Sequence, residues 1–375
     1  MMSGLYTFLM GNVVTFILVL SLLVFVHEMG HYLVGRWSGI RILAFSVGFG
    51  PEIFGFNDRH GTRWKISAIP LGGYVRFFGD EDASSKPDSE KVAAMSEEDR
   101  ARSFAGAKLW KRAATVAAGP IANFLLAIAI FAVLFSVYGR MIADPVVAEV
   151  TPDGAAAAAG ILPGDLLVAI DGSKVETFDD VRRYVAIRPS QKIVVTVERG
   201  GQKLDVPMVP QRTDRTDQFG NKIELGQIGI VTNKEAGNFR PRTYTPLEAV
   251  REGVIESAGI VTGTFKYIAN IFAGSMRADQ LGGPIRVAQA SGQMASLGIG
   301  AVLQLAATLS VSIGLLNLMP VPVLDGGHLM FYAVEAVRGR PLGAKAQEIA
   351  FRIGLAMILT LMVFTTWNDI SLSSG

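Results

Sequence analysis

The chain contains four long stretches without a charged residue, and these limit it to folds that can enter a membrane. They cover residues 1–26, 113–138, 287–324 and, more briefly, 353–367. A helix that crosses the hydrocarbon core of a bilayer needs about 20 mainly apolar residues. The first stretch lacks the basic start and small-residue cleavage site of a signal peptide, which disfavours that alternative. The sequence therefore predicts a multi-span α-helical membrane protein with about four transmembrane helices.

The amino-acid composition agrees with a protein whose partner is the lipid bilayer, and it limits which side chains can bind a metal ion. Half of the residues are hydrophobic and 18% are charged, whereas soluble domains carry about 25% charged residues. The net charge of +2, with no basic stripe, argues against nucleic acid as a partner. The chain has no cysteine and only four histidines. Any metal ion must therefore be held by His, Asp or Glu side chains.

Basic residues predict the orientation of the spans. Arg36 and Arg41 follow the first stretch, and Lys108 and Lys111 precede the second. Short cytoplasmic loops carry an excess of Lys and Arg. We therefore expect residues 38–110 to lie in the cytoplasm, and both termini and the segment after the second span to lie outside.

The segments between the spans differ in character. Residues 42–79 are rich in Gly, Phe and β-branched residues and predict short strands or hairpins, and residues 80–103 predict a polar loop. Residues 145–230 alternate strand-like runs, such as "DLLVAI" and "KIVVTVER", with the helix-like "FDDVRRYVAI". This pattern predicts a small α+β domain. Residues 246–276 predict an amphipathic helix that either packs on this domain or lies on the membrane surface.

The first span ends in "VHEMGHYLVGRW", which places three ionisable groups where they are costly. His27 and His31 are four residues apart on a helix, about 40° around the axis and about 6 Å along it, so they can share one metal ion. Glu28 follows His27 on the helix, so it lies beside the open position of the metal ion, where a water would bind. Zinc lowers the pKa of such a water to about 7, and a carboxylate can take its proton. The pattern is typical of a metalloprotease; the alternative is two core histidines beside a carboxylate.

A catalytic zinc usually has three protein ligands and an open position, so a third ligand is expected. Asp325 follows the third apolar stretch in "NLMPVPVLDGGHL", where Pro320 and Pro322 interrupt regular helix. The irregular backbone can let Asp325 approach the first span; a helix cap at the membrane edge is the alternative. His328 is a rival ligand, although a histidine bonded to backbone is the simpler interpretation. His60 is expected to be solvated.

Three motifs stand together: "HEMGH" in the first span, "GPIAN" in the second and "NLMPVPVLDGG" in the third. This combination resembles the site-2 protease family of intramembrane zinc metalloproteases, and within it the bacterial regulator-of-sigma-E protease type. "IPLGGYVRFFGD" and "LGGPIRVA" are also similar to that subfamily, so the resemblance covers nearly the whole chain. It implies one Zn²⁺ per chain bound by His27, His31 and Asp325, with Glu28 as the catalytic base.

The resemblance also implies residues that bind substrate. Asn317 matches the Asn before the Pro-x-Pro segment, and its amide can hold substrate or stabilise an oxyanion. Gly119 and Asn123 match the second-span motif near the active site; we count Asn123 as a substrate-binding candidate, with helix packing as the alternative. Gly72 and Gly73 match the membrane-associated β-hairpin, whose edge can pair with an extended substrate strand.

The segment "GILPGDLLVAIDG" resembles a PDZ domain, which in this family faces the periplasm and limits access by bulky substrates. The best-known members carry two such domains, whereas this sequence contains one. The expected fold is therefore about four transmembrane helices with membrane-associated β-hairpins and an inserted PDZ-like α+β domain. Its expected divisions are 1–37 (first span), 38–107 (β region and cytoplasmic loop), 108–139 (second span), 140–232 (PDZ-like domain), 233–297 (amphipathic or linker helix), 298–340 (third span) and 341–375 (fourth span and C-terminus).

The function implied by the resemblance is regulated intramembrane proteolysis in the bacterial inner membrane. The expected substrates are transmembrane segments of single-pass membrane proteins, such as anti-sigma factors and remnant signal peptides. Two alternatives come from other classes. A membrane PDZ scaffold with a structural metal would keep its function without Glu28. A metal or proton transporter would carry ionisable residues in several spans, yet the second stretch has none.

Overall fold

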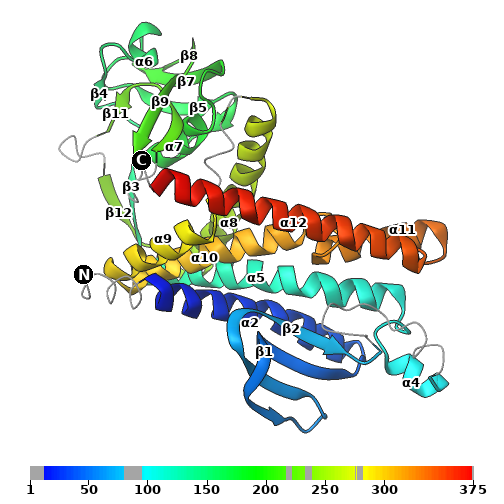
Figure 1. Ribbon diagram of the computed structural model, residues 1–375. Coiled ribbons are helices and arrows are strands. Elements are labelled where there is room, and N and C mark those ends of the chain that lie inside the picture. Colours follow the sequence, from blue (N-terminus) through cyan, green and yellow to red (C-terminus); the bar gives the residue numbers. More distant parts are fainter. Residues whose placement is uncertain are drawn as a thin grey trace. The chain divides into compact units, whose positions relative to one another are not determined.

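A computed structural model describes residues 12–79, 95–216, 222–232, 239–274, 276 and 282–373. The start of the first predicted span and most of the predicted polar loop, residues 80–94, lie outside the described residues. The chain divides into two compact units (Figure 1). One unit comprises Met1–Phe131 and Pro284–Phe364, and the other comprises Ala132–Gly283 and Thr365–Gly375.

Four helices are long and apolar enough to cross a membrane: α2 (Val14–Trp37), α5 (Leu109–Val137), α10 (Ile299–Asn317) and α12 (Ala344–Ser373). They confirm the prediction of about four spanning helices. Three of them pack closely through glycine. A Cβ on Gly30 of α2 would collide with the Ala118 backbone of α5, and a Cβ on Gly314 of α10 would lie 3.1 Å from the Pro120 carbonyl oxygen.

The strands predicted across residues 42–79 form one antiparallel pair, β1 (Ile42–Asn57) and β2 (Arg63–Phe77). The register shifts along the pair, so Phe45 has Cα partners both at Trp64 and at Val75. The first part of β1 therefore lies between two segments of β2 and is paired on both sides. The sheet lies beside α2 (Figure 1). A buried cluster that includes Phe45, Val75 and Tyr32 of α2 joins the sheet to this helix.

The connection from α10 to α11 (Asp325–Arg338) positions the predicted third ligand. The helix α10 ends at Asn317, and residues 318–324, with their two prolines, are not helical. A Cβ on Gly326 or Gly327 would collide with the backbone carbonyls of Leu318 and Val321. The two glycines therefore let the start of α11 fold tightly against this connection. Two smaller helices, α4 (Glu97–Arg102) and α9 (Pro284–Ser296), complete the described part of the unit.

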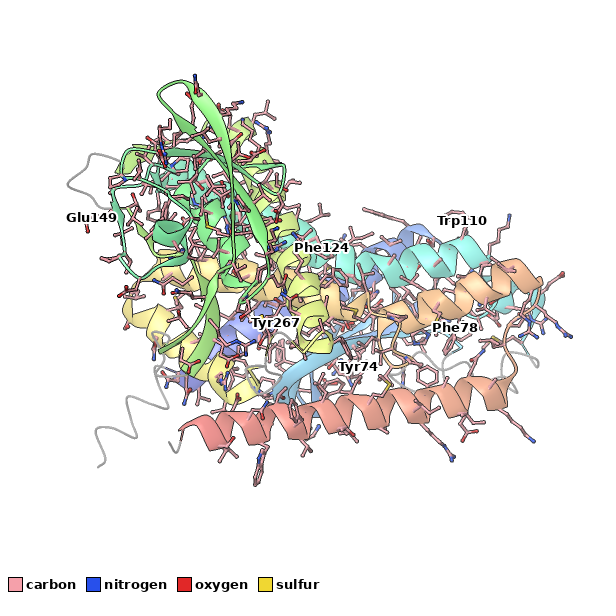
Figure 2. The ribbon with its side chains drawn as sticks, turned by 90° about the horizontal axis from the view of Figure 1, so that it is seen from above. Tyr74, Phe78, Trp110, Phe124, Glu149 and Tyr267 are labelled. Carbon is pink, nitrogen blue, oxygen red and sulfur yellow. The ribbon has the colours of Figure 1, made fainter. Side chains whose placement is uncertain are left out.

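The second unit contains a four-stranded antiparallel sheet in the order β6-β5-β7-β8. Inward residues of β7 alternate with half-exposed ones, as its sequence "IVVTVER" predicts, and the core includes Leu167, Ile170, Val195 and Val197. Figure 2 shows the side chains around this sheet. The elements are β3 (Arg140–Ala143), β4 (Glu149–Val150), α6 (Ala155–Ala158), β5 (Leu166–Ile170), β6 (Ser173–Lys174), α7 (Phe178–Ala186), β7 (Ile193–Arg199), β8 (Gln202–Met208), β9 (Gln211–Thr216), β10 (Lys222–Gln227), β11 (Ile230–Val231) and β12 (Phe239–Arg242).

The helix predicted at residues 246–276 is α8 (Pro246–Phe272). It begins with a capping box in which Thr245 and Glu248 bond each other's backbone N–H groups, and Pro246 takes a first-turn position that needs no N–H donor. The Glu256 carboxylate lies 3.2 Å from Arg140 and 2.9 Å from Arg183 of the same unit. One face of α8 therefore packs on this unit, in agreement with the first of the two predicted positions.

Candidate metal centre

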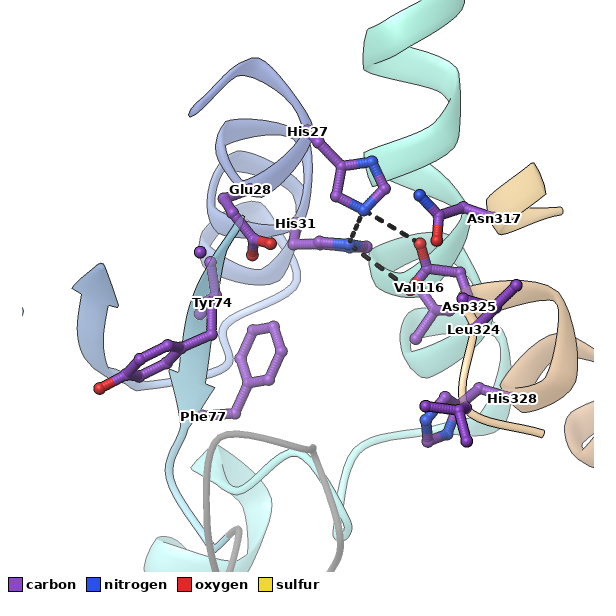
Figure 3. Close-up of a pocket in the computed structure, with 13 residues that line it drawn as sticks. His27, Glu28, His31, Tyr74, Phe77, Val116, Asn317, Leu324, Asp325 and His328 are labelled. Carbon is purple, nitrogen blue, oxygen red and sulfur yellow. Dashed lines mark hydrogen bonds and ion pairs between the residues drawn. The ribbon is translucent and has the colours of Figure 1, made fainter. Parts of the chain in front are cut away.

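One face of α2 presents both histidines of the HExxH motif to the same point. The Nε2 atoms of His27 and His31 lie 3.2 Å apart, and their rings are nearly perpendicular. Each residue is only 8% exposed. The helical spacing predicted this shared direction, and Figure 3 shows both rings turned away from the α2 axis toward α5 and α11.

Asp325, the first residue of α11, brings a carboxylate to the same point. Its Oδ2 atom lies 3.1 Å from His27 Nε2, and its Oδ1 atom lies 3.6 Å from His31 Nε2. The ligand atoms that the three residues offer all lie within 4.8 Å of one another. The structure therefore assembles the predicted set of His27, His31 and Asp325 from two helices far apart in the sequence.

Helix α5 supports the histidines from behind. The Nδ1 atom of His31 lies 2.9 Å from the Thr115 carbonyl oxygen, and the Nδ1 atom of His27 lies 3.2 Å from the Asn123 amide nitrogen. Gly119 lies between these two contacts, and a Cβ there would collide with the His31 ring. The two imidazoles therefore fit against α5 only where this helix has no side chain.

Glu28 lies between the histidines and the edge of β2. The Val75 backbone N–H donates to its carboxylate, and a Cβ on Gly73 would lie 3.3 Å from its Cγ. Figure 3 shows Glu28 beside the strand that carries Tyr74. Glu28, the three candidate ligands and Gly73 line one cavity of about 180 Å³. The carboxylate, the metal position and a strand edge therefore share one space.

The other predicted residues have different positions. Asn317 and His328 line the same cavity, and His328 packs against Phe351 with ring centroids 5.4 Å apart. Gly72 lies outside the cavity lining; it has a positive φ of +102° and a Cβ there would collide with Phe49. The His60 side chain is 62% exposed.

Asn123 is completely buried and does not line the cavity. Its side chain lies behind His27, on the side away from Asp325. Sequence reasoning also missed the Thr115 carbonyl, because a backbone acceptor leaves no signature in side-chain identity. The motif "GPIAN" does contain a signal for the Gly119 contact, since a glycine inside an apolar helix often marks close packing.

The residues present fit a catalytic zinc ion. Two imidazole nitrogens and one carboxylate oxygen form a three-ligand set that leaves a position for water or substrate. The glycine surface of α5 accommodates both rings. The Thr115 carbonyl can accept the Nδ1–H of His31, which leaves its Nε2 lone pair free for a metal ion.

This metal centre lies on apolar helices and has the Glu28 carboxylate beside it. Together these features identify the class of protein as a membrane metalloprotease. The chain belongs to peptidase family M50, whose family model matches residues 15–361. This finding confirms the resemblance to site-2 proteases, the assignment as an enzyme and zinc as the cofactor.

Similar proteins from three bacteria agree with this family assignment. A protein of Agrobacterium fabrum, provisionally named a zinc metalloprotease, is 74% identical over 364 residues, which cover 97% of each chain. A protein of Rhizobium meliloti with the same provisional description is 69% identical over 370 residues, or 99% of each chain. The metalloprotease MmpA of Caulobacter vibrioides is 38% identical over 380 residues, covering 96% of this chain and 95% of its own.

Proposed function

We propose that this protein is a zinc-dependent endopeptidase that cleaves transmembrane segments of single-pass membrane proteins inside the bacterial inner membrane. The observation that carries the proposal is the position of Glu28 and the three candidate ligands on helices that can span a membrane. A peptide bond must therefore reach this depth to be cut. Anti-sigma factors and remnant signal peptides are the substrate classes that we propose from the family.

The proposed chemistry assigns a separate task to each residue. His27, His31 and Asp325 would hold the zinc ion, which lowers the pKa of a bound water to about 7 and polarises a carbonyl group. Glu28 accepts the proton of the attacking water and passes it to the leaving amine. Asn317 lines the same cavity and offers an amide N–H to the developing oxyanion.

The edge of β2 offers a way to hold an unwound substrate. In a helix the peptide groups are hydrogen-bonded within the chain, so a substrate must lose helical structure before it is cut. The segment around Val75 pairs with β1, and its Val75 N–H donates to Glu28, so this edge of β2 also presents a backbone group to the cavity. We propose that the extended substrate pairs with the edge at Gly73, as in other cases of strand addition. Gly72 would support this segment because its lack of a side chain leaves room for the Phe49 ring.

We propose further that the second unit is a periplasmic PDZ-like domain that limits access to the protease. Its helix α7 and the segment 225–230 line a groove of about 290 Å³ with apolar residues such as Val181, Val185 and Ile228. A peptide-binding scaffold with a structural metal remains the alternative function, and it differs in needing no general base.

The experiment that tests the function compares wild type with Glu28→Gln in detergent-purified full-length protein. A single-pass model substrate is supplied, and bound zinc is measured on both proteins. We expect Glu28→Gln to keep its zinc and to cut nothing measurable, because the amide cannot accept the proton. Equal cutting by both proteins would overturn the assignment of Glu28.

The ligand set has a matched control in the same cavity. Asp325→Ala should abolish zinc retention and activity, whereas His328→Ala, three residues further along α11, should leave most of the zinc in place. Complete loss of zinc in His328→Ala, with zinc retained in Asp325→Ala, would make His328 the third ligand.

A further inference from the structure

We infer that Asn123 is a positioning residue for the zinc ligand His27, through its side-chain oxygen. This inference rests on the proposed ligand set and adds a residue to it. Asn123 is fully buried and lies outside the cavity lining, so a substrate that enters the cavity does not reach its side chain. Its amide nitrogen lies 3.2 Å from His27 Nδ1.

The argument begins with the direction of the His27 ring. Its Nε2 atom faces His31 and Asp325 at 3.2 and 3.1 Å, so Nε2 is the atom that would bind the metal ion. A neutral imidazole carries one proton, and a metal-bound Nε2 leaves that proton on Nδ1. The buried Nδ1–H of His27 then needs a hydrogen-bond acceptor.

His31 shows what such an acceptor does. Its Nδ1 atom lies 2.9 Å from the Thr115 carbonyl oxygen, which can only accept. At His27 the corresponding place is taken by the Asn123 amide, whose Oδ1 atom is buried and accepts no hydrogen bond within the described structure. A half-turn of the amide brings Oδ1 to the position of the nitrogen, where it accepts the Nδ1–H. In the present orientation Oδ1 has no donor among the described residues, and the tautomer of His27 required for metal binding favours the turned orientation.

The backbone of Asn123 is held in place independently of His27. The Ser310 hydroxyl donates a 2.8 Å hydrogen bond to the Asn123 carbonyl oxygen. A Cβ on Gly314, one turn further along α10, would lie 3.3 Å from the Asn123 Cβ. The amide therefore projects from a fixed point, and it can fix the rotation of the His27 ring in turn.

The test is zinc affinity of the full-length detergent-purified protein, measured by competition with a chelator. Asn123→Leu keeps the approximate volume but removes the acceptor, and we expect it to weaken zinc binding about 10–100-fold. Asn123→Asp keeps an acceptor oxygen, and we expect zinc affinity within about threefold of wild type, as in other carboxylate–histidine–zinc arrangements. Wild-type affinity in Asn123→Leu, or an equal loss in Asn123→Asp, would overturn the inference.

Two controls separate positioning from packing. Ser312→Ala removes a hydroxyl group of the same helix α10 that donates to the Thr308 carbonyl oxygen, so zinc affinity should stay at the wild-type level; a loss equal to that of Asn123→Leu would mean that packing alone explains the effect. If Asn123→Leu does not fold, judged by thermal unfolding in excess chelator, Asn123→Ala is used in its place. A wild-type protein without zinc, or His27→Ala with full zinc, would count against the metal site itself and not only against Asn123.

Discussion

The hydroxyl group of Tyr32 donates a 2.8 Å hydrogen bond to the carboxylate of Asp58. Tyr32 is the residue that follows His31, the second histidine of α2. The Trp64 indole N–H donates to the same oxygen at 3.2 Å, and the Thr62 backbone N–H donates to the other oxygen at 2.9 Å. Asp58 therefore ties the turn between β1 and β2 to the helix that carries Glu28. This connection adds to the buried cluster of Tyr32, Phe45 and Val75 that holds the sheet against α2.

Asp58→Asn should weaken this connection in a pH-dependent way. Burial alone would raise the pKa of Asp58, but hydrogen bonds from Thr62, Tyr32 and Trp64 lower it to about 2. The ionised carboxylate therefore stabilises the fold above its usual pKa of 3.8, and this stability is lost as the pH falls toward 2. Near neutral pH we expect Asp58→Asn to lower the free energy of unfolding by about 1–3 kcal/mol.

Thermal unfolding in detergent, repeated from neutral to acidic pH, measures this effect. The difference in unfolding temperature between wild type and Asp58→Asn should shrink below about pH 4. Tyr32→Phe removes one donor and keeps the carboxylate, so it should cost only about 0.5–1.5 kcal/mol. A difference that stays constant down to the acidic end would mean that the charge of Asp58 does not contribute.

Gly119→Ala should damage the metal centre although it adds a single methyl group. The new Cβ would collide with the His31 ring and lie 2.9 Å from His27 Cε1, so at least one ring must rotate away from the metal position. We expect zinc affinity to fall about tenfold or more, by analogy with the loss of groups that orient metal ligands.

The matched control is another helical glycine replaced in the same way. A Cβ on Gly263 of α8 would meet nothing within 4 Å, so Gly263→Ala should leave zinc binding unchanged and stabilise its helix by about 0.5–1 kcal/mol. Zinc content by metal analysis after gel filtration distinguishes the two variants. Equal zinc content in both would show that the rings do not need the glycine surface.

Much of this site could be predicted from the sequence, because its main signals are local. The i, i+4 spacing of His27 and His31 fixes their shared direction once the helix is recognised. Asp325 was predicted from an ionisable residue beside two prolines at the end of an apolar stretch. Both signals depend on side-chain type and on distances within one segment.

The remaining features depend on partners that a single sequence does not specify. Phe45 pairs with both Trp64 and Val75, and alternation along a strand shows which face is buried but not which segments are neighbours. The acceptor for His31 is a carbonyl group on α5, which any residue at position 115 would supply. The burial of Asn123 behind His27 follows from how α2, α5 and α10 pack, so the motif alone could not separate a substrate contact from a supporting one.

Glu335→Gln should loosen the helix that carries Asp325. Arg112 of α5 donates to the Glu335 carboxylate of α11 at 2.6 and 3.3 Å, and both side chains are largely buried. Replacing one partner leaves the guanidinium group without its ion pair, which should cost about 1.5–3 kcal/mol of stability. Unfolding temperature and zinc affinity should both fall. The exchanged pair Arg112→Glu with Glu335→Arg should recover part of the loss, and no recovery would indicate that other contacts of the two side chains are responsible.

The rate of cleavage should depend on how easily the substrate helix unwinds. If the substrate pairs with β2 beside Glu28, its backbone must be extended over the residues that flank the cleaved bond. Gly and Pro destabilise a helix interior by about 1 and about 3 kcal/mol relative to Ala. A Gly-Pro pair near the cleavage position of a single-pass substrate should therefore raise the rate several-fold over a Leu-Leu pair.

The same Gly-Pro pair at the far end of the span is the matched control and should have little effect. Rates measured in detergent under single-turnover conditions separate unwinding from product release, and equal rates for all three substrates would argue that pairing with the β2 edge is not part of the reaction.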